Sequence, residues 1–446
     1  MLEEQYRQIA KEMIMAGVKA ADPTASVQSN VSLDKEAGIL TICGQKYALK
    51  DYQKILLFGV GKAACPMVAA FEQIIKPDDG AVITKIGSEI SQVPVNSVPV
   101  YYAYHPEPRE INVEKTREII SKIESLDPKK RSLVVMMVSG GGSALFCMPA
   151  PSISVEDMFR LNELLMKCGA TIHHINIIRK HVDMVKGGRF GRLCVEHGAD
   201  VATLIVSDVV GDDLSTIASG PTYKDDSTFA DAIDLMKRYK IWDEAPLSIR
   251  AYLEKGLNDP SLEPPREIPA GVSNFLIGTN LTAMQAAKQV AEKHGFNTII
   301  LTTQNRGEAK IVSLAYMGIA KEIQDSGNPI SPPAALIVGG EMIVTFDWED
   351  RDGFGPNREF VLSGAIEIAG RPNLVIAGAD TDGVDGEGKS GAIADGRTIA
   401  RSKLDPDYYL NKHDAEIFFD ALGDSLQFQS RTNVNDIIVI LVGPKN

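Results

Sequence analysis

Two glycine-rich loops contain the residue types that bind phosphate. The first, Gly59-Val60-Gly61-Lys62-Ala63-Ala64, follows a predicted strand and opens a predicted helix. Glycines let a backbone approach an anion closely, the helix N-terminus attracts the anion, and Lys62 adds a cation. The loop is not a Walker A motif, because Leu56 and Ala63 stand where that motif requires glycine and Ser or Thr. By itself it fits a dinucleotide site, a phosphate site and a tight turn equally well, and Lys62 favours phosphate.

The second loop, Ser139-Gly140-Gly141-Gly142-Ser143, follows an apolar strand predicted at Leu133–Val138. It offers several N–H donors and two hydroxyls at the carboxyl end of a strand, where open α/β sheets bind ligands. Glycine after a core strand is costly unless the backbone needs a positive φ or a close approach. A phosphate site is therefore favoured over a flexible turn.

Charged residues after these loops could serve a phosphorylated or acidic substrate. Arg179, Lys186 and Arg189 could face one way on a helix and clamp a carboxylate or a phosphate, although a solvated helix face fits them equally well. Asp208 comes just after a predicted core strand and suits Mg²⁺ binding or general-base work. For at least one of Asp212 and Asp213, helix capping is the expected role.

The C-terminal half contains two further polar clusters. Glu341 follows a strand and a Gly-Gly pair, and Asn357 and Arg358 stand at the start of a predicted helix. The segment Ala379–Gly386 carries three acids that could hold Mg²⁺ or substrate hydroxyls, or could equally form turns. These acids are Asp380, Asp382 and Asp385.

The elements that must position these residues alternate between strand and helix. The first twenty or so residues have helical periodicity, and the Pro-rich segment Leu257–Gly271 is typical of a domain linker. Alternation at this spacing predicts largely parallel, doubly wound α/β sheets. The strands expected are Lys54–Gly59, Gly80–Ile83, Val98–Tyr102, Ser132–Val138, Asp200–Val206, Asn274–Ile277, Thr298–Thr302, Ala334–Val338, Ile343–Phe346, Asn373–Ala377 and Ile437–Val442. The helices expected between them are Ala63–Ile75, Val113–Leu126, Val155–Cys168, Leu281–Lys293, Val312–Asp325 and Arg358–Ala369.

Composition excludes several classes of function. A net charge of −13 argues against a nucleic-acid or anionic-membrane partner recruited by bulk charge. The N-terminus lacks the apolar stretch of a signal peptide, and no apolar run approaches the length of a membrane helix. The five cysteines form no C-x-x-C pair, so reduced thiols and a cytoplasmic location are expected. No G-x-S-x-G elbow supports a serine hydrolase.

Taken together and in order, these motifs resemble those of the type-II glycerate kinases, the family that carries the MOFRL domain at its C-terminus. The resemblance runs from about Gly59 to Asp436 and covers most of the chain. The motifs are G-x-G-K-A at Gly59–Ala63, H-P at His105, S-G-G-G-S-A at Ser139–Ala144, R-K-H with K-G-G-R at Arg179–Arg189, S-D-V-x-G-D-D at Ser207–Asp213, A-S-G-P-T at Ala218–Thr222, G-G-E at Gly339–Glu341, D-G-x-D-G at Asp382–Gly386, and T-N-V-N-D at Thr432–Asp436.

The resemblance implies an ATP- and Mg²⁺-dependent kinase that phosphorylates D-glycerate at the 2-hydroxyl, giving 2-phosphoglycerate. It also implies two doubly wound, Rossmann-like α/β/α domains with an active-site cleft between them. We expect these domains at residues 1–268 and at residues 269–446, the latter of MOFRL type. The expected partners are glycerate and ATP, with no nucleic acid and no membrane, and a homodimer is left open.

The resemblance implies a central catalytic role for Lys62, and the logic of phosphoryl transfer suggests a role for each other candidate residue, with the Ser139–Ser143 loop and Lys62 holding the transferred phosphoryl group. Lys62, Asp208 and Arg358 are expected to be catalytic, with Asp208 or Asp382 as the ligand of Mg²⁺. Expected substrate or phosphate contacts are Gly59, Gly61, His105, Ser139, Gly140, Gly141, Gly142, Ser143, Arg179, Lys186 and Arg189. Expected contacts to the nucleotide or in the cleft are Asp212, Glu341, Asn357, Asp380, Asp382, Asp385, Asn433 and Asn435.

Two motifs depart from the family, and two other functions compete. The usual T-G-P-T-G before T-N-V-N-D is replaced by Phe428-Gln429-Ser430-Arg431. The family usually reads G-G-R-N-Q-E where this chain has Gly355-Pro356-Asn357-Arg358-Glu359, so Arg358 is displaced from the usual arginine position. An NAD(P)-dependent hydroxypyruvate reductase would use the G-x-G-x-x-A pattern at Gly59–Ala64, but no acidic ribose ligand follows the next strand, which ends at Thr84-Lys85. A non-catalytic module that binds a nucleotide or a phosphosugar is the remaining alternative.

Overall fold

The computed structural model describes residues 2–87, 93–346 and 353–445, and the chain divides into two compact units. We call residues 23–277 the central unit and residues 1–22 with 278–446 the terminal unit. The boundary expected at 268/269 differs from this division, because the strand after the Pro-rich segment belongs to the central sheet. The N-terminal helix α1 (Leu2–Ala20) joins the terminal unit, where it packs against α11.

The central unit is built on a six-stranded sheet with the order β6-β5-β4-β7-β8-β9. The pairs among β4, β5, β6, β7 and β8 are parallel, as the alternating pattern predicted. All seven residues of β7 are buried, which explains its continuous apolar sequence. The strands are β4 (Lys54–Val60), β5 (Asp79–Lys85), β6 (Val100–Ala103), β7 (Ser132–Val138), β8 (Ala199–Val206) and β9 (Val272–Gly278).

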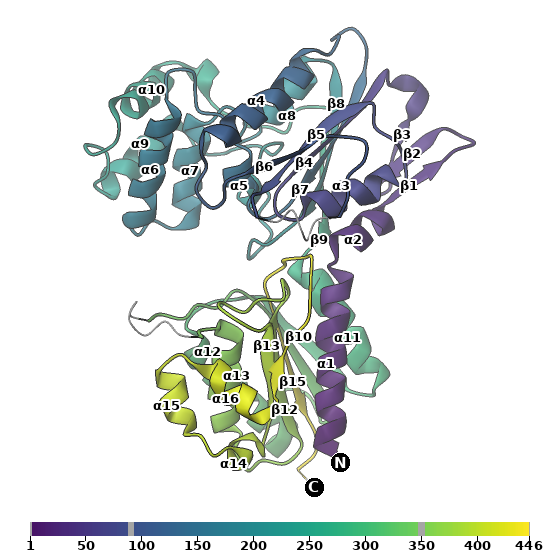
Figure 1. Ribbon diagram of the computed structural model, residues 1–446, viewed down its shortest axis with the longest axis vertical. Coiled ribbons are helices and arrows are strands. Elements are labelled where there is room, and N and C mark those ends of the chain that lie inside the picture. Colours follow the sequence, from purple (N-terminus) through teal and green to yellow (C-terminus); the bar gives the residue numbers. More distant parts are fainter. Residues whose placement is uncertain (1, 88–92, 347–352, 446) are drawn as a thin grey trace. The chain divides into compact units, whose positions relative to one another are not determined.

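Helices of the central unit fall into those packed on the sheet and a separate helical group with its own core (Figure 1). Those along the sheet are α3 (Ala64–Glu72), α4 (Glu110–Glu124), α5 (Gly142–Leu145) and α8 (Arg189–Glu196). The separate group contains α6 (Val155–Lys167), α7 (Ile172–Val182), α9 (Phe229–Arg238) and α10 (Leu247–Asn258). Short 3-10 turns lie at η1 (Leu49–Asp51), η2 (Ile217–Ser219) and η3 (Pro260–Leu262).

A small antiparallel sheet that we did not predict precedes β4. It consists of β1 (Val31–Asp34), β2 (Ile39–Ile42) and β3 (Gln45–Ala48), and it follows helix α2 (Pro23–Asn30). Its strands have four residues each, which is too short for a clear apolar alternation to appear in the sequence.

The terminal unit has a mixed sheet with the order β10-β11-β15-β12-β13-β14. The last strand, β15, inserts between β11 and β12 and runs antiparallel to both, so this sheet is less parallel than predicted, while the α/β class is confirmed. The strands are β10 (Asn297–Asn305), β11 (Ala334–Gly340), β12 (Leu374–Asp380), β13 (Gly391–Asp395), β14 (Ser425–Leu426) and β15 (Asp436–Val442).

Helices cover both faces of this mixed sheet. Figure 1 shows α1 and α11 on one side of the sheet, and α12, α13 and α16 on the other. The remaining bounds are α11 (Asn280–Lys293), α12 (Ala309–Ser326), α13 (Pro356–Glu367), α14 (Thr398–Arg401), α15 (Pro406–Asn411) and α16 (Ala415–Leu422). The strand predicted at Ile343–Phe346 is wrong, because Ile343 forms only an isolated bridge with Glu308.

Two further features of the fold agree with the sequence. All five cysteines are free thiols, and Cys65, Cys147 and Cys194 are buried. Among the described helices, none combines the length and the apolar character needed to cross a membrane.

Helix α1 is fixed to the terminal unit by a buried arginine. The Arg7 guanidinium donates to Asp395 at 3.1 Å and also to Asp424, and all three side chains are almost fully buried. We expect Arg7→Met to destabilise the protein by about 3 kcal/mol, because two buried carboxylates lose a partner. Urea unfolding would measure the loss, with the exposed Lys11→Met on the same helix as the control. Equal stability of the two variants would show that Arg7 does not anchor the helix.

Candidate functional site

The two glycine-rich loops meet at one edge of the central sheet. Their strands, β4 and β7, are parallel neighbours, with Val60 opposite Val138, so the loops leave the sheet side by side. Hydrogen bonds join them directly: the Lys62 N–H donates to the Gly140 carbonyl at 2.9 Å, and the Ala63 N–H donates to Ser139 Oγ at 3.0 Å. The two loops that were each predicted to bind phosphate are therefore in direct contact.

Glycine is required where the two loops touch. Gly61 has a φ of +126°, and a methyl group added there would lie 2.3 Å from Ser139 Oγ. Gly141 has a φ of +82°, a left-handed conformation that side chains rarely adopt, and a methyl group there would lie 2.9 Å from the His105 ring. Both positions combine a positive φ with a close approach.

The turn at Ser139–Ser143 leaves N–H donors unused. Within the described part of the chain, the backbone N–H groups of Gly140, Gly141 and Ser143 have no hydrogen-bond acceptor. Backbone N–H groups that converge in a turn bind anions. We call this turn, together with Lys62, the cradle.

Lys62 and His105 lie beside the turn and differ in charge. Lys62 is exposed, and its ammonium forms no hydrogen bond or ion pair with the residues described, while a methyl group added at Gly141 would lie 3.4 Å from its Cγ. Burial, with the charges of Lys62 and Lys85, lowers the pKa of His105 to about 4. At neutral pH the cationic side chain of Lys62 and the neutral imidazole of His105 therefore lie beside the turn.

Asp208 places a carboxylate against the same turn. It follows β8, the neighbour of β7, and a methyl group on Gly140 would lie 2.0 Å from its Oδ2. Burial raises the pKa of Asp208, and the charge of Lys62 opposes this shift. A carboxylate with a raised pKa accepts a proton more readily, so Asp208 can act as a base beside the cradle.

The segment after Asp208 contains an acid with a structural role, Asp213, and a serine with a strained backbone, Ser219. Asp213 accepts from Ser215 at 2.7 Å and from Thr216, so it serves local structure, as expected for one of the paired acids. Burial raises the pKa of Asp212, which has a φ of +53°. Ser219, at a φ of +58°, is buried and hydrogen-bonds to Ser143 at 2.9 Å.

Ser219 was not among the predicted site residues. The signal that could have identified it is the A-S-G-P-T string, in which serine stands before a Gly-Pro turn. Ala218 also has a positive φ, and its Cβ lies 2.7 Å from a methyl group added at Gly142. Strained residues of this kind cluster at functional sites, so the segment belongs to the same site as the cradle.

The three basic residues that were predicted to clamp the substrate, namely Arg179, Lys186 and Arg189, form hydrogen bonds within the protein. Arg179 donates to Asn162 Oδ1 at 2.8 Å, and Arg189 donates to the Leu262 carbonyl at 2.6 Å. Lys186 donates to the carbonyls of Ser143 at 2.7 Å and of Phe146 at 2.9 Å. Lys186 thus holds the cradle in place through the Ser143 carbonyl. The three cations bind different protein oxygens and do not form one clamp.

In the terminal unit, acids gather where β11, β12 and β15 meet. Asp436 lies opposite Asp380 and Gly340 in the sheet, and it accepts from the Met342 N–H at 2.8 Å and from Asn357 Nδ2 at 2.5 Å. Burial, together with the nearby acids Asp385 and Glu341, raises the pKa of Asp436 to about 8, although the hydrogen bonds from Met342 and Asn357 oppose the shift. Burial and then Asp382 and Asp436 raise the pKa of Asp380.

Arg358, predicted as catalytic, is fully buried in this unit. Its guanidinium pairs with Asp385 at 3.2 Å and with Glu416, and it donates to the carbonyls of Phe354 at 2.9 Å and Glu387 at 3.0 Å. The side chain therefore closes a loop and presents no exposed face to a substrate.

The other residues predicted for this half hold turns next to the acids. Asp382 accepts from the Val384 N–H at 2.8 Å, and Asn433 accepts from the Asn435 N–H at 2.9 Å. The Glu341 N–H donates to the Asn305 carbonyl at 2.9 Å. In the ranges that the structure describes, no group of three or more His, Cys, Asp or Glu residues could by itself hold a metal ion.

Comparisons with known proteins agree with this arrangement. Residues 9–254 match a family model described as a domain of unknown function, DUF4147, and residues 334–436 match the MOFRL family. A glycerate 2-kinase from Pyrococcus horikoshii is 36% identical over 452 residues, which cover 100% of this chain and 99% of that protein. The chain belongs to the type-II glycerate kinase family. Membership identifies it as a kinase enzyme and confirms the resemblance seen in the motifs.

A solved structure agrees with this glycerate kinase family member in fold, and a sequence relative carries a different name. The crystal structure of a glycerate kinase from Thermotoga maritima has a TM-score of 0.86 and 32% identity, covering 98% of this chain and 100% of that one. A relative from Agrobacterium vitis, named only provisionally as a hydroxypyruvate reductase, is 34% identical over 98% of this chain and 94% of its own.

The buried acids of the terminal unit predict a pH-dependent stability. The folded protein holds a proton on Asp436 up to a pKa of about 8, well above the value in the unfolded chain. The contribution of the Asp436 proton to the free energy of unfolding is therefore complete at low pH, and it is lost as the pH rises through about 8. We expect a lower urea midpoint at pH 9 than at pH 6, and a smaller difference in Asp436→Asn. Asp407→Asn, an exposed acid in the same unit, is the control, and equal pH dependence in both variants would contradict the assignment.

Proposed function

We propose that this protein is an ATP-dependent kinase that transfers a phosphoryl group to the 2-hydroxyl of D-glycerate, giving 2-phosphoglycerate. The observation that carries the proposal is the cradle, where three N–H donors without an acceptor among the described residues lie beside the Lys62 ammonium and a partly buried Asp208. Phosphoryl transfer depends mainly on positioning and on stabilising negative charge. Relatives named as glycerate 2-kinases, 34–36% identical along the whole chain, support glycerate as the acceptor.

Each part of the cradle then has a role in the proposed reaction. The N–H groups of Gly140, Gly141 and Ser143 would bind oxygens of the transferred phosphoryl group, and Lys62 would neutralise their charge. Asp208 would orient the acceptor hydroxyl and take its proton, since burial raises its pKa. Lys186, bound to the Ser143 carbonyl, would keep the turn in this geometry.

The proposed cofactor set includes Mg²⁺ with ATP. Mg²⁺ in kinases is usually bound by one or two carboxylates together with substrate phosphates, so a cluster of three protein acids is not required. Asp208 fits this requirement, because its partly buried carboxylate lies against the cradle, and Asp382 is the alternative ligand. When bound there, Mg²⁺ would neutralise charge on the ATP phosphates.

A hydroxypyruvate reductase is supported less well. A dinucleotide fold uses the N–H groups of its first glycine loop to bind pyrophosphate. Here those groups are used inside the protein: the Gly61 N–H donates to the Ile83 carbonyl at 3.1 Å, and those of Lys62 and Ala63 donate to the second loop. The provisional reductase name of two relatives is thus the main argument that remains for this activity.

Two assays on the purified protein test the proposed reaction. We expect ADP release with ATP, Mg²⁺ and D-glycerate, and no NADH oxidation with hydroxypyruvate. Lys62→Met should lower kcat/KM at least about a hundredfold, because it removes the cation at the developing charge. Lys54→Met is the control, because Lys54 lies at the start of β4, the strand that ends just before the Lys62 loop. NADH oxidation without ADP release would overturn the proposal.

A further inference from the structure

Helix α7 carries two buried donor groups whose capacity is not used within the protein. Asn176 and Lys180 stand four residues apart, so they share one face of the helix, and each is only 3% exposed. Asn176 Oδ1 accepts from Ser219, while its Nδ2 donates to none of the residues described. For Lys180, the one acceptor within the described ranges is Asp225 Oδ1, at 3.4 Å.

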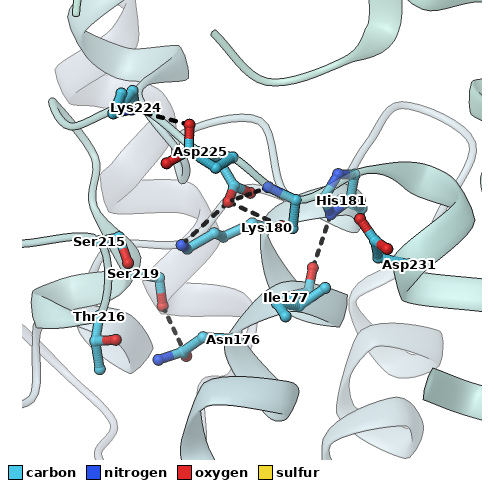
Figure 2. Close-up of polar contacts among 12 residues, drawn as sticks. Asn176, Ile177, Lys180, His181, Ser215, Thr216, Ser219, Lys224, Asp225 and Asp231 are labelled. Atoms are coloured by element: carbon cyan, nitrogen blue, oxygen red, sulfur yellow. Dashed lines mark hydrogen bonds and ion pairs between the residues drawn. The ribbon is translucent and has the colours of Figure 1, made fainter. Parts of the chain in front are cut away.

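The hydrogen bond to Asp225 leaves most of the Lys180 ammonium unsatisfied. An ammonium has three donors, and its bonds to carboxylates are normally about 2.7–2.9 Å long. Asp225 Oδ1 also accepts from Ser227 Oγ at 2.8 Å and from the Ser227 N–H at 3.2 Å, so it is shared among three donors. Figure 2 shows the Lys180 side chain extending from α7 to a position between Asp225 and the segment that carries Ser215 and Ser219.

These donors adjoin the cradle through Ser219. Ser219 Oγ lies 2.9 Å from Ser143 Oγ and 3.2 Å from Asn176 Oδ1, which links the phosphate-binding turn to helix α7. The strained backbone of Ser219, at a φ of +58°, holds this link in place. A small molecule bound at the cradle therefore has the Asn176 amide and the Lys180 ammonium as close neighbours.

We propose that Lys180 and the Asn176 amide bind the carboxylate of the acceptor, a site that deepens the proposed function and rests on it. Buried donors without acceptors are costly, and a substrate carboxylate would supply two acceptor oxygens. Lys186 is less suited, since the Ser143 and Phe146 carbonyls already accept from it, and Arg179 and Arg189 each already donate to a protein oxygen at 2.8 Å or less. Lys180 is thus a specificity residue for acidic acceptors.

The test compares D-glycerate with D-glyceramide, its neutral amide, in wild type and in Lys180→Met. We expect KM for glycerate to rise roughly tenfold to a hundredfold, while kcat/KM for glyceramide stays unchanged. The double variant Lys180→Met/Asp225→Asn avoids leaving a buried carboxylate unpaired and should give the same result. Lys224→Met removes a charge from a more exposed ion pair nearby and serves as the matched control.

Two outcomes would overturn this site. One is an equal loss with both acceptors in the single and double variants, which indicates a structural role. The other is an unchanged KM for glycerate. If the wild-type protein releases no ADP with either acceptor, the proposed function fails, and calorimetric titration with D-glycerate decides the site separately. Weaker binding in Lys180→Met than in Lys224→Met then supports a carboxylate site, and equal binding rejects it.

Discussion

Three backbone N–H groups at the turn Ser139–Ser143 have no acceptor in the part of the protein that the structure describes, and the site depends on this constraint. The turn can form because Gly141 adopts a left-handed conformation and Gly61 allows the first loop to approach Ser139. A side chain at either glycine would separate the loops. Glycine therefore occurs at the positions where the two loops must approach each other closely and the turn must leave N–H donors without an acceptor.

Polar residues from several elements hold this turn from different directions. Lys186 donates to the Ser143 carbonyl, Ser219 hydrogen-bonds to the Ser143 hydroxyl, and Asp208 packs against Gly140. Each of these residues follows a strand or lies near a helix end, so the sheet sets their positions. The unused donors of Lys180 and Asn176 extend the same arrangement towards an acidic acceptor. The terminal unit has its own centre at Asp436, whose raised pKa comes mainly from burial.

The sequence indicated Ser139–Ser143 as a phosphate site because ligands in open α/β sheets bind at the carboxyl ends of strands, and the structure adds that this turn contacts the first glycine loop. The sequence did not separate Lys180 from Arg179 and Lys186, because helical spacing cannot show which cation protein carbonyls will satisfy. For Arg358, residue type suggested catalysis, whereas Asp385 and nearby carbonyls enclose the side chain. The periodicity of α1 predicted a helix but could not show that it would pack on the sheet of the terminal unit.

The central claim is that the turn Ser139–Ser143 binds phosphate through its backbone. Amide resonances of ¹⁵N-glycine-labelled protein, followed during titration with ATP and Mg²⁺, test it most directly. We predict that the resonances of Gly140 and Gly141 shift as the nucleotide binds, and that Gly38, in the turn between β1 and β2, does not respond. Saturable nucleotide binding that leaves the Gly140 and Gly141 resonances unchanged would contradict the account.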